Sequence, residues 1–470
     1  MSHKLLIIGA LIAIALALGL GIIIGHFAIT KTTSNTSFKY DRLTRPADQQ
    51  NYQTFINSIQ AANIEANLKD LTSRPHMAGL PEDLESAQVI EQRWKSDGLQ
   101  VTKPKYNVLL SYPDNNNPNQ VTLISDNGMA IFQTAGVEKI YDSTLPKTVN
   151  PFLAYTPNGT VSSTKLFYAN NGELEGSEVP VEWRGTLSNV TYRYGGELRN
   201  ASTIEVKTYN RLERKDTYNV IGIMKGEIEP DRYIAIGNHR DSWTLGSVDP
   251  TSGTATLLEI TRVLGQMYKN GFRPRRSLMF CSWGAEEYAL IGSLEYVQEY
   301  VKVLGARIVS YLNVDNAVEG KMCIINVEMI TLLMFKKGNY TINIDTSPLL
   351  FDIILQAAKM VPSAYDPPGL TVYDKWMNVN RNNVTNEPKM RYGLGSGSDY
   401  YGFDQLIGSS NMDMRYTYNF ADYGNPDSYP LYHTSYEVFS MMKSFIDPDF
   451  KYIDQAHRTI GQLWGVLTLV

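Results

Sequence analysis

Two histidines in this chain lie beside acidic or aromatic residues, in positions where side chains could bind a metal ion. His239 follows the apolar stretch 233–236, and His433 lies in the segment YPLYHTSYE. Histidine and carboxylate side chains are common zinc ligands, and a shared carboxylate can bridge two ions. The candidate ligands are His239, Asp249, Glu286, Glu287, Asp315 and His433. The pattern therefore indicates metal-dependent chemistry.

The adjacent acids Glu286 and Glu287 could divide the work, one binding a metal ion and the other moving protons. Two ions about 3.5–4 Å apart can activate a water molecule and hold a tetrahedral oxyanion. A structural alternative stays open at this point. A single histidine at a strand end often only completes a hydrogen-bond network, and paired glutamates are usually solvated.

The elements that must position these residues alternate from residue 218 onward. Strands are predicted at 219–224, 233–236, 277–283 and 306–314, and a helix at 252–269 with Thr251 or Ser252 as its N-cap. Strands that alternate with helices favour a largely parallel sheet covered on both faces. Ligand sites in such sheets lie at the carboxyl ends of the strands, where His239, Glu286 and Asp315 fall.

The composition excludes some classes of protein. The chain has 470 residues, of which 43% are hydrophobic and 19% charged, so it can bury a large core and is longer than a typical single domain. A net charge of -5 and the lack of a basic stripe argue against a nucleic-acid partner. Two cysteines permit one disulfide, but neither a disulfide framework nor a cysteine-rich zinc site.

The N-terminal segment predicts a membrane anchor. Residues 5–24 are continuously apolar, and the uncharged run continues to residue 30 with His26 as its only ionisable residue. About 20 apolar residues span a bilayer as a helix. We expect a cytoplasmic tail at 1–4, a transmembrane anchor at 5–29 and a stalk at 30–50, with a cleaved signal peptide as the alternative. Sequons at Asn158, Asn189, Asn200 and Asn339 favour a secretory-pathway face for the body.

Five long segments occur in the order found in a known family. They are IEPDRYIAIGNHRDSW, VDPTSGTATLLEI, RPRRSLMFCSWGAEEYALIGSLEY, LGSGSDYYGF and YPLYHTSYE. With the flanking sequence, these segments resemble the glutamate carboxypeptidase II family over most of 50–170 and 180–460. Members of that family are membrane-anchored, di-zinc exopeptidases related to the transferrin receptor.

The resemblance implies an α/β zinc exopeptidase fold, with a mixed, largely parallel sheet flanked by helices. It implies hydrolysis of small peptides, including release of a C-terminal glutamate. It also implies a single-pass type II protein of the cell membrane with an extracellular catalytic body.

The resemblance also implies which residue binds which of two zinc ions per chain. His239 and Asp315 would bind one ion, and Glu287 and His433 the other. Asp249 would bridge both ions.

Further roles follow from the same resemblance. Glu286 would be the general base that takes a proton from the bridging water, and Tyr432 would donate a hydrogen bond to the oxyanion. Asp241 would orient His239. The residues expected to contact the substrate are Gly397, Ser398 and Arg415.

Three departures from the family affect the expected domains. We expect a peptidase domain at 51–115 and 207–446, with a β-rich remnant of the apical protease-associated domain at 116–206. Residues 447–470 are expected to begin a truncated helical domain and to expose apolar surface. An unusually apolar insertion, 321–338, interrupts the peptidase domain. Family members homodimerise, and this chain would lack much of that interface.

Substrate preference departs from the family too. Asp413 stands where an arginine is expected, and Ser398 replaces an asparagine. An acidic residue there would repel acidic substrates, so peptidase chemistry is better supported than glutamate release. Two alternatives remain: a non-catalytic, receptor-like protein and a truncated, inactive family member. The receptor branch has lost metal ligands that this chain retains.

Overall fold

The computed structural model describes residues 48–138, 143–167, 195–197, 201–319, 340–364, 367–418, 429, 431–442, 446 and 453–469. The expected anchor at 5–29 and the insertion at 321–338 lie outside these described residues. Within the described ranges, no helix is long and apolar enough to cross a membrane. Gln49–Val470 form one compact unit.

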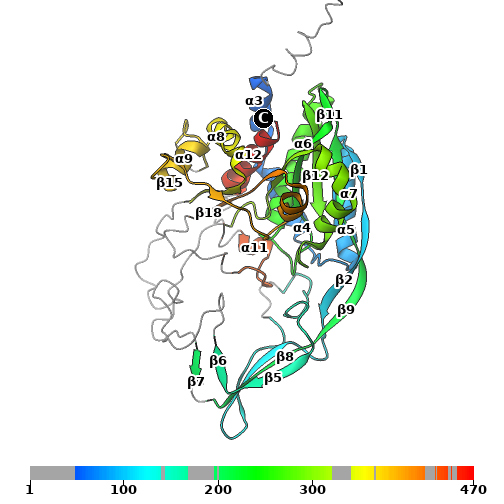
Figure 1. Cartoon of the computed structure of the whole chain (residues 1–470), viewed down its shortest axis with the longest axis vertical. Helices are drawn as coiled ribbons and strands as arrows, with labels where there is room; N and C mark the ends of the chain where they lie inside the picture. The colour runs from blue at the N-terminus through cyan, green and yellow to red at the C-terminus, as the bar shows by residue number, and fades with distance from the viewer. Residues whose placement is uncertain are drawn as a thin grey trace, which may run out of the picture. The chain divides into compact units, whose positions relative to one another are not determined.

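A mixed eight-stranded sheet runs through this unit (Figure 1). In spatial order its strands are β1 (Gln100–Thr102), β10 (Val220–Met224), β12 (Arg276–Trp283), β11 (Glu229–His239), β13 (Ile308–Asn313), β18 (Ser410–Tyr418), β14 (Tyr340–Thr346) and β17 (Arg391–Tyr392). The four central strands β12, β11, β13 and β18 are parallel. Strands β1 and β10 pair antiparallel with their neighbours, whereas β14 pairs antiparallel with β18 and parallel with β17. The predicted mixed, largely parallel sheet is therefore present.

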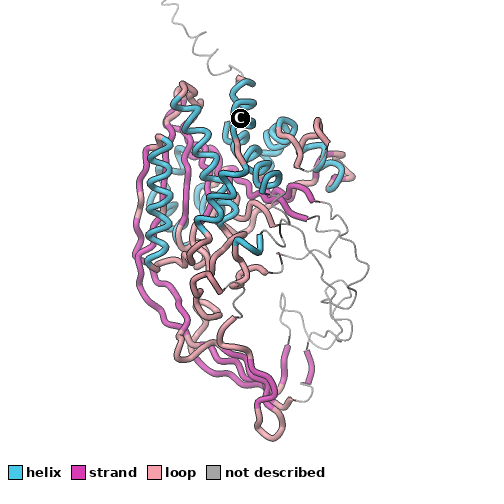
Figure 2. The backbone as a smooth tube through the Cα atoms, turned by 180° about the vertical axis from the view of Figure 1, so that it is seen from behind, coloured by secondary structure: helices cyan, strands magenta, loops and turns pink. Residues whose placement is uncertain are grey.

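Helices cover both faces of the sheet, as the view from behind also shows (Figure 2). Successive residues of a strand point to opposite faces. Leu278 and Phe280 accordingly join a large apolar core, and Met279 and Cys281 a smaller one. The helices of the larger core are α3 (Gln49–Ser58), α4 (Ala61–Leu71), α5 (Pro81–Asp97), α6 (Thr251–Lys269), α8 (Phe351–Met360), α9 (Val372–Val379) and α12 (Arg458–Leu469). The smaller core contains α7 (Ile291–Arg307), α10 (Tyr400–Gly402) and η4 (Phe403–Ile407).

Helix α6 begins close to its predicted start, but its cap differs from the prediction. Pro250 is the N-cap residue, and no side chain caps the helix. The Ser252 hydroxyl instead donates to the carbonyl of Val248, inside the helix-entry turn, and accepts from the backbone N–H of Ala317. The hydroxyl therefore ties the start of α6 to the segment that follows β13.

A second β-region is built from short, paired strands. The ribbon of β2 (Lys105–Pro113) and β9 (Asn210–Tyr218) continues in the chain into a four-stranded sheet ordered β4 (Ala130–Gln133), β3 (Gln120–Ile124), β8 (Thr203–Thr208), β5 (Gly159–Ser163). We call this four-stranded sheet the small sheet. Strands β6 (Lys165–Phe167) and β7 (Gly195–Glu197) form a separate pair. The remaining short elements are η3 (Pro348–Leu350), β15 (Arg381–Asn382), β16 (Glu387–Pro388), α11 (Phe439–Met441) and η8 (Ile453–His457).

The C-terminal helix corrects one expectation. Apolar surface was expected to be exposed near residues 450–470, yet α12 is buried along almost its whole length. Leu463 and Trp464 belong to the larger core, and the Trp464 indole N–H donates to the carbonyl of Leu312 on β13 at 3.1 Å. Gly465 fits against the ring of Phe55, where a Cβ atom would clash. Helix α12 is therefore part of the core that supports the central sheet.

Candidate metal centre

The six candidate ligands come together at the carboxyl edge of the central sheet. His239 is the last residue of β11, Glu286 and Glu287 follow β12, and Asp315 follows β13. Asp249 lies in the loop that leads into α6, and His433 lies in a turn beyond β18. The parallel arrangement of β12, β11 and β13 explains why residues distant in sequence meet at one edge.

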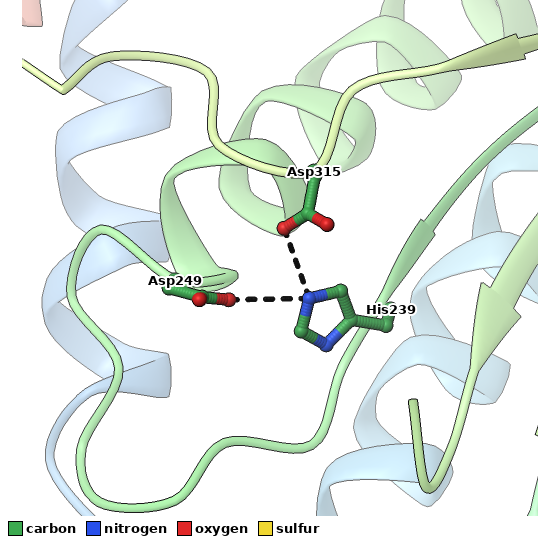
Figure 3. Close-up of side chains that lie close together, drawn as sticks. All are labelled: His239, Asp249 and Asp315. Atoms are coloured by element: carbon green, nitrogen blue, oxygen red, sulfur yellow. Dashed lines mark hydrogen bonds and ion pairs between the residues drawn. The ribbon is translucent and has the colours of Figure 1, made fainter. Parts of the chain in front are cut away.

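The first cluster consists of His239, Asp249 and Asp315 (Figure 3). The His239 Nε2 atom lies 3.0 Å from Asp315 Oδ1 and 3.2 Å from Asp249 Oδ1. Glu286 Oε2 lies 3.8 Å from the same nitrogen. Three carboxylates thus surround one ring nitrogen.

The second cluster consists of Asp249, Glu287 and His433. The His433 Nε2 atom lies 3.0 Å from Glu287 Oε2 and 3.1 Å from Asp249 Oδ2. Asp249 therefore directs Oδ1 to the first cluster and Oδ2 to the second. His433 has a backbone φ of 58°, a left-handed conformation that is uncommon for a residue with a side chain.

The side chains of the two clusters are better suited to binding metal ions than to hydrogen bonding with one another. An imidazole nitrogen carries at most one proton, so His239 Nε2 cannot donate to all the carboxylates around it. The buried Asp249 Oδ1 accordingly has no hydrogen-bond partner among the described residues. Nitrogen and carboxylate ligands in two groups of three, sharing one carboxylate, are a ligand set suited to zinc.

The electrostatics of the cluster reflect this excess of buried carboxylates. Burial alone would lower the pKa of His239, but nearby carboxylates, Glu286 first, raise it well above its usual value. Burial likewise opposes charge on His433, yet hydrogen bonds to Asp249 and Glu287 raise its pKa to about 10. Burial also raises the pKa of Glu287 to about 7 and that of Glu286 well above its usual value. The centre therefore favours positive charge, which a metal ion supplies.

Asp241 contacts the centre through two different groups. Its backbone carbonyl lies 3.0 Å from His239 Nδ1 and fixes the ring, whereas its carboxylate is 3.8 Å from that nitrogen. The carboxylate instead accepts the backbone N–H groups of Glu286, at 2.9 Å, and Glu287, at 3.3 Å. Asp241 thus holds both His239 and the turn that carries the paired glutamates.

Gly253 allows α6 to approach the edge of the sheet closely. A Cβ atom on this residue would lie 2.5 Å from the carbonyl oxygens of Val314 and Asp315 and from the Asn238 side-chain amide. The Asn238 amide donates to the same two carbonyls, at 2.9 and 3.0 Å. The backbone that carries Asp315 is therefore fixed from two sides.

The residues expected to contact substrate are placed in different ways. Tyr432 is 43% exposed and its ring stacks on that of His433, with centroids 3.6 Å apart. Gly397 is exposed, but Ser398 is buried and its Oγ accepts the Asn313 side-chain amide at 3.0 Å. Arg415 is paired with Glu319 at 2.8 Å. Tyr432 is thus accessible beside His433, whereas Ser398 is buried and Arg415 already has a partner.

Sequence reasoning missed one buried carboxylate beside the centre. Glu437 is 1% exposed and accepts hydrogen bonds from the backbone N–H groups of His433, at 3.0 Å, and Asp249, at 3.4 Å. Burial raises its pKa well above the usual value. The signal in the sequence was its position four residues after His433, in YHTSYEV.

Residues 219–444 match the profile of peptidase family M28. The chain is 30% identical to the aminopeptidase NAALADL1 of Mus musculus over 608 aligned residues, which cover 98% of this chain and 78% of the mouse protein. The chain belongs to peptidase family M28. The aligned stretch is longer than the chain, so the mouse protein contains internal segments with no counterpart here.

Other relatives of this M28 protein carry carboxypeptidase names. The chain is 28% identical to a glutamate carboxypeptidase 2 homolog of Caenorhabditis briggsae, covering 88% of this chain and 69% of the relative. It is 39% identical to the probable glutamate carboxypeptidase LAMP1 of Arabidopsis thaliana, covering 53% of this chain and 31% of the relative. The resemblance to the glutamate carboxypeptidase II family is thereby confirmed.

Solved structures share the M28 fold. The peptidase M28 precursor from Shewanella amazonensis superposes with a TM-score of 0.54 and 13% identity, covering 90% of this chain and 97% of that one. The aminopeptidase from Aneurinibacillus sp. strain AM-1 gives 0.52 and 17%, covering 89% and 94%. A zinc aminopeptidase from Bacillus subtilis gives 0.50 and 17%, covering 87% and 94%. With its two clusters of ligand residues, this M28 member is a metallopeptidase.

Proposed function

We propose that this chain is a di-zinc exopeptidase that hydrolyses small peptides. The observation that carries the proposal is the placement of Asp249, which offers one carboxylate oxygen to each of two ligand clusters. The zinc aminopeptidase named among the structural neighbours supports zinc as the metal. His239 and Asp315 would hold one ion with Asp249, and Glu287 and His433 the other.

The proposed chemistry divides the two adjacent glutamates. Bound zinc would polarise the peptide carbonyl and lower the pKa of the attacking water, which would make the water a better nucleophile. Glu287 belongs to a ligand cluster, whereas Glu286 belongs to neither, so Glu286 is the carboxylate left to act as general base. It would take a proton from the attacking water and pass it to the leaving amine. Tyr432, exposed beside His433, would donate a hydrogen bond to the oxyanion.

Charge around the expected substrate contacts bears on specificity. Arg415 already pairs with the buried Glu319, and Asp413 lies two residues away on the same strand. Asp413 is held near the centre, since its carboxylate accepts the Asn313 side-chain amide at 2.8 Å. Acidic peptides would therefore gain little attraction from the paired Arg415 and would be repelled by the Asp413 carboxylate. We propose that neutral peptides are better substrates and that release of a C-terminal glutamate is slow.

Aminopeptidase action is a second candidate. An aspartate at position 413, where an arginine was expected, would not repel a cationic α-amino group as an arginine would. The name of the mouse relative, aminopeptidase, agrees with this preference.

An assay with differently blocked dipeptides tests the proposal. Exopeptidase action predicts cleavage of either N-acetylated peptides with a free carboxylate or peptide amides with a free amine, and the preferred type identifies the end recognised. Including acidic and neutral members of each type tests the charge preference. Efficient cleavage of peptides blocked at both ends would refute exopeptidase action. Elemental analysis of the same preparation should find two zinc ions per chain, and one ion would refute the di-zinc centre.

We also propose that the chain is a single-pass type II protein of the cell membrane, with its catalytic body outside the cell. The apolar run at 5–24 and the sequons support this. Protease treatment of intact cells tests it, because an external body would be digested. Survival of the body in intact cells would contradict the orientation.

A further inference from the structure

The two clusters are held by different kinds of structure. In the first, His239 ends a central strand and Asp315 lies two residues beyond another. In the second, Asp249 and His433 are separated by 184 positions and both lie in irregular backbone. Loops do not fix side-chain spacing as regular strands do. Some other contact must therefore keep these two ligands together.

Glu437 makes that contact with a single side chain. Its Oε1 accepts the His433 backbone N–H at 3.0 Å, and its Oε2 accepts the Asp249 backbone N–H at 3.4 Å. The hydroxyl of the buried Tyr429 also donates to Oε1. The backbone carbonyl of Glu437 accepts the N–H of Ser247, two residues before Asp249, at 3.2 Å. Both loops are therefore joined at one residue.

The local backbone shows why such a contact matters. His433 adopts a left-handed conformation, which persists only where surrounding contacts enforce it. Its N–H bond to Glu437, together with the turn in which the Glu437 N–H donates to the Thr434 carbonyl at 3.2 Å, supplies this constraint. Release of the turn would move His433 away from Glu287 and Asp249.

We propose that Glu437 is a positioning residue that sets the affinity of the second cluster for its metal ion. It holds the backbones of Asp249 and His433 at the spacing that their side chains need. The proposal rests on the proposed di-zinc centre. Partners of this kind, one step removed from the metal, typically change metal affinity by 10–100-fold when they are removed.

Glu437→Gln tests the proposal with little change in size. The amide nitrogen that would face Asp249 cannot accept its N–H, so one of the two loop contacts is lost. Zinc content is measured on the purified full chain after equilibration with increasing chelator. We expect the variant to lose the zinc of the second cluster at about 10–100-fold lower chelator activity than the wild type. The other zinc shares Asp249 but is also held by His239 and Asp315 at strand ends, so it should be lost later. Excess zinc should restore turnover, which lost folding would not allow.

Glu259→Gln is the matched control. Glu259, on α6, is also buried and also accepts a backbone N–H, that of Gln60 at 2.8 Å. Its other partners, Asn63 and Arg262, are not metal ligands and do not lie in the ligand loops. Its zinc retention should equal that of the wild type. Equal zinc retention by Glu437→Gln and Glu259→Gln would overturn the proposal. The zinc count of the wild type, by contrast, tests only the di-zinc centre.

Tyr429→Phe keeps the test decisive if Glu437→Gln does not fold. This change removes the hydroxyl that fixes Glu437 Oε1, so the carboxylate should hold the two loop N–H groups less firmly. We expect the second cluster to lose less zinc affinity than in Glu437→Gln. Unchanged zinc retention in a folded Tyr429→Phe chain would then count against Glu437 as a positioning residue.

Discussion

Two regions of the molecule differ in how far their charged and apolar side chains are exposed. One is the carboxyl edge of the central sheet, and the other is the β2–β9 ribbon with the small sheet. At the edge, Arg240 and Asp83 form an ion pair in which both side chains are 1% exposed. On the ribbon, Lys105 and Asp216 form a pair with 55% and 37% exposure. The small sheet also leaves Val161 71% exposed.

The difference teaches where each region can tolerate change. At the edge, Arg240 and Asp83 are each other's fixed partners, because an unpaired buried charge would be costly. Arg240, next to His239 in the chain, donates to Asp83, Ser86, Ser282 and the Tyr218 carbonyl. The ribbon and small sheet are held mainly by backbone pairing, and their exposed side chains carry little energy. The comparison predicts large mutational effects at the edge and small ones elsewhere.

The largest effect should come from Glu286→Gln. An amide of the same size cannot accept the proton of the attacking water, so turnover should fall by about 10²–10⁴-fold. Because Glu286 belongs to neither ligand cluster, zinc content should stay at the wild-type value. Steady-state kinetics and elemental analysis on one preparation measure both. Near-normal turnover would remove Glu286 from the proposed mechanism.

The buried ion pair should show the next largest effect. Asp83→Asn leaves Arg240 charged and buried without its partner, and should lower the free energy of unfolding by about 3–5 kcal/mol. Asp216→Asn, which breaks the exposed pair on the ribbon, should cost much less, because solvent screens that pair. Denaturant unfolding of both variants measures the contrast. Equal costs would show that burial does not distinguish the two regions.

A pH effect is expected from His76, which precedes helix α5. Burial lowers the pKa of His76 to about 4, against an unfolded value near 6.5. The folded protein holds His76 in its neutral form. The stability that depends on a neutral His76 is therefore fully present above about pH 6.5. It is lost as pH falls from about 6.5 to about 4, by roughly 3 kcal/mol.

His76→Asn removes this titration and should make stability less sensitive to acid. The measurement is the unfolding free energy of the wild type minus that of the variant, taken at several pH values. This difference should decrease as the solution is acidified. A difference that stays constant with pH would mean that His76 is not held neutral.

The smallest effect should occur in the small sheet. Val161→Thr changes an exposed side chain on β5 and should alter the unfolding free energy by less than about 0.5 kcal/mol. Val263→Thr places a hydroxyl on the buried side of α6, where Val263 is 1% exposed, and should cost about 1–3 kcal/mol. Thermal unfolding compares the two. A large cost at Val161 would mean that the small sheet is more tightly packed than its exposure indicates.

The sequence alone predicted the central sheet and the edge at which the candidate ligands meet. Strand periodicity is local, so Tyr233 to Ile236 could be recognised as a buried strand, although β11 begins earlier, at Glu229. The parallel order of β12, β11 and β13 then places His239, Glu286 and Asp315 together. The types of the ligands, imidazole and carboxylate, were likewise visible in the chain.

Only the tertiary structure decided how those residues are connected. The two oxygens of Asp249 are assigned to different clusters by packing between segments far apart in sequence. The same packing pairs Arg415 with Glu319, so that a residue expected to bind substrate already has a partner. It also buries α12 against β13, although its apolar residues suggested an exposed end. Local patterns record which face of an element is apolar, but not which distant surface will cover it.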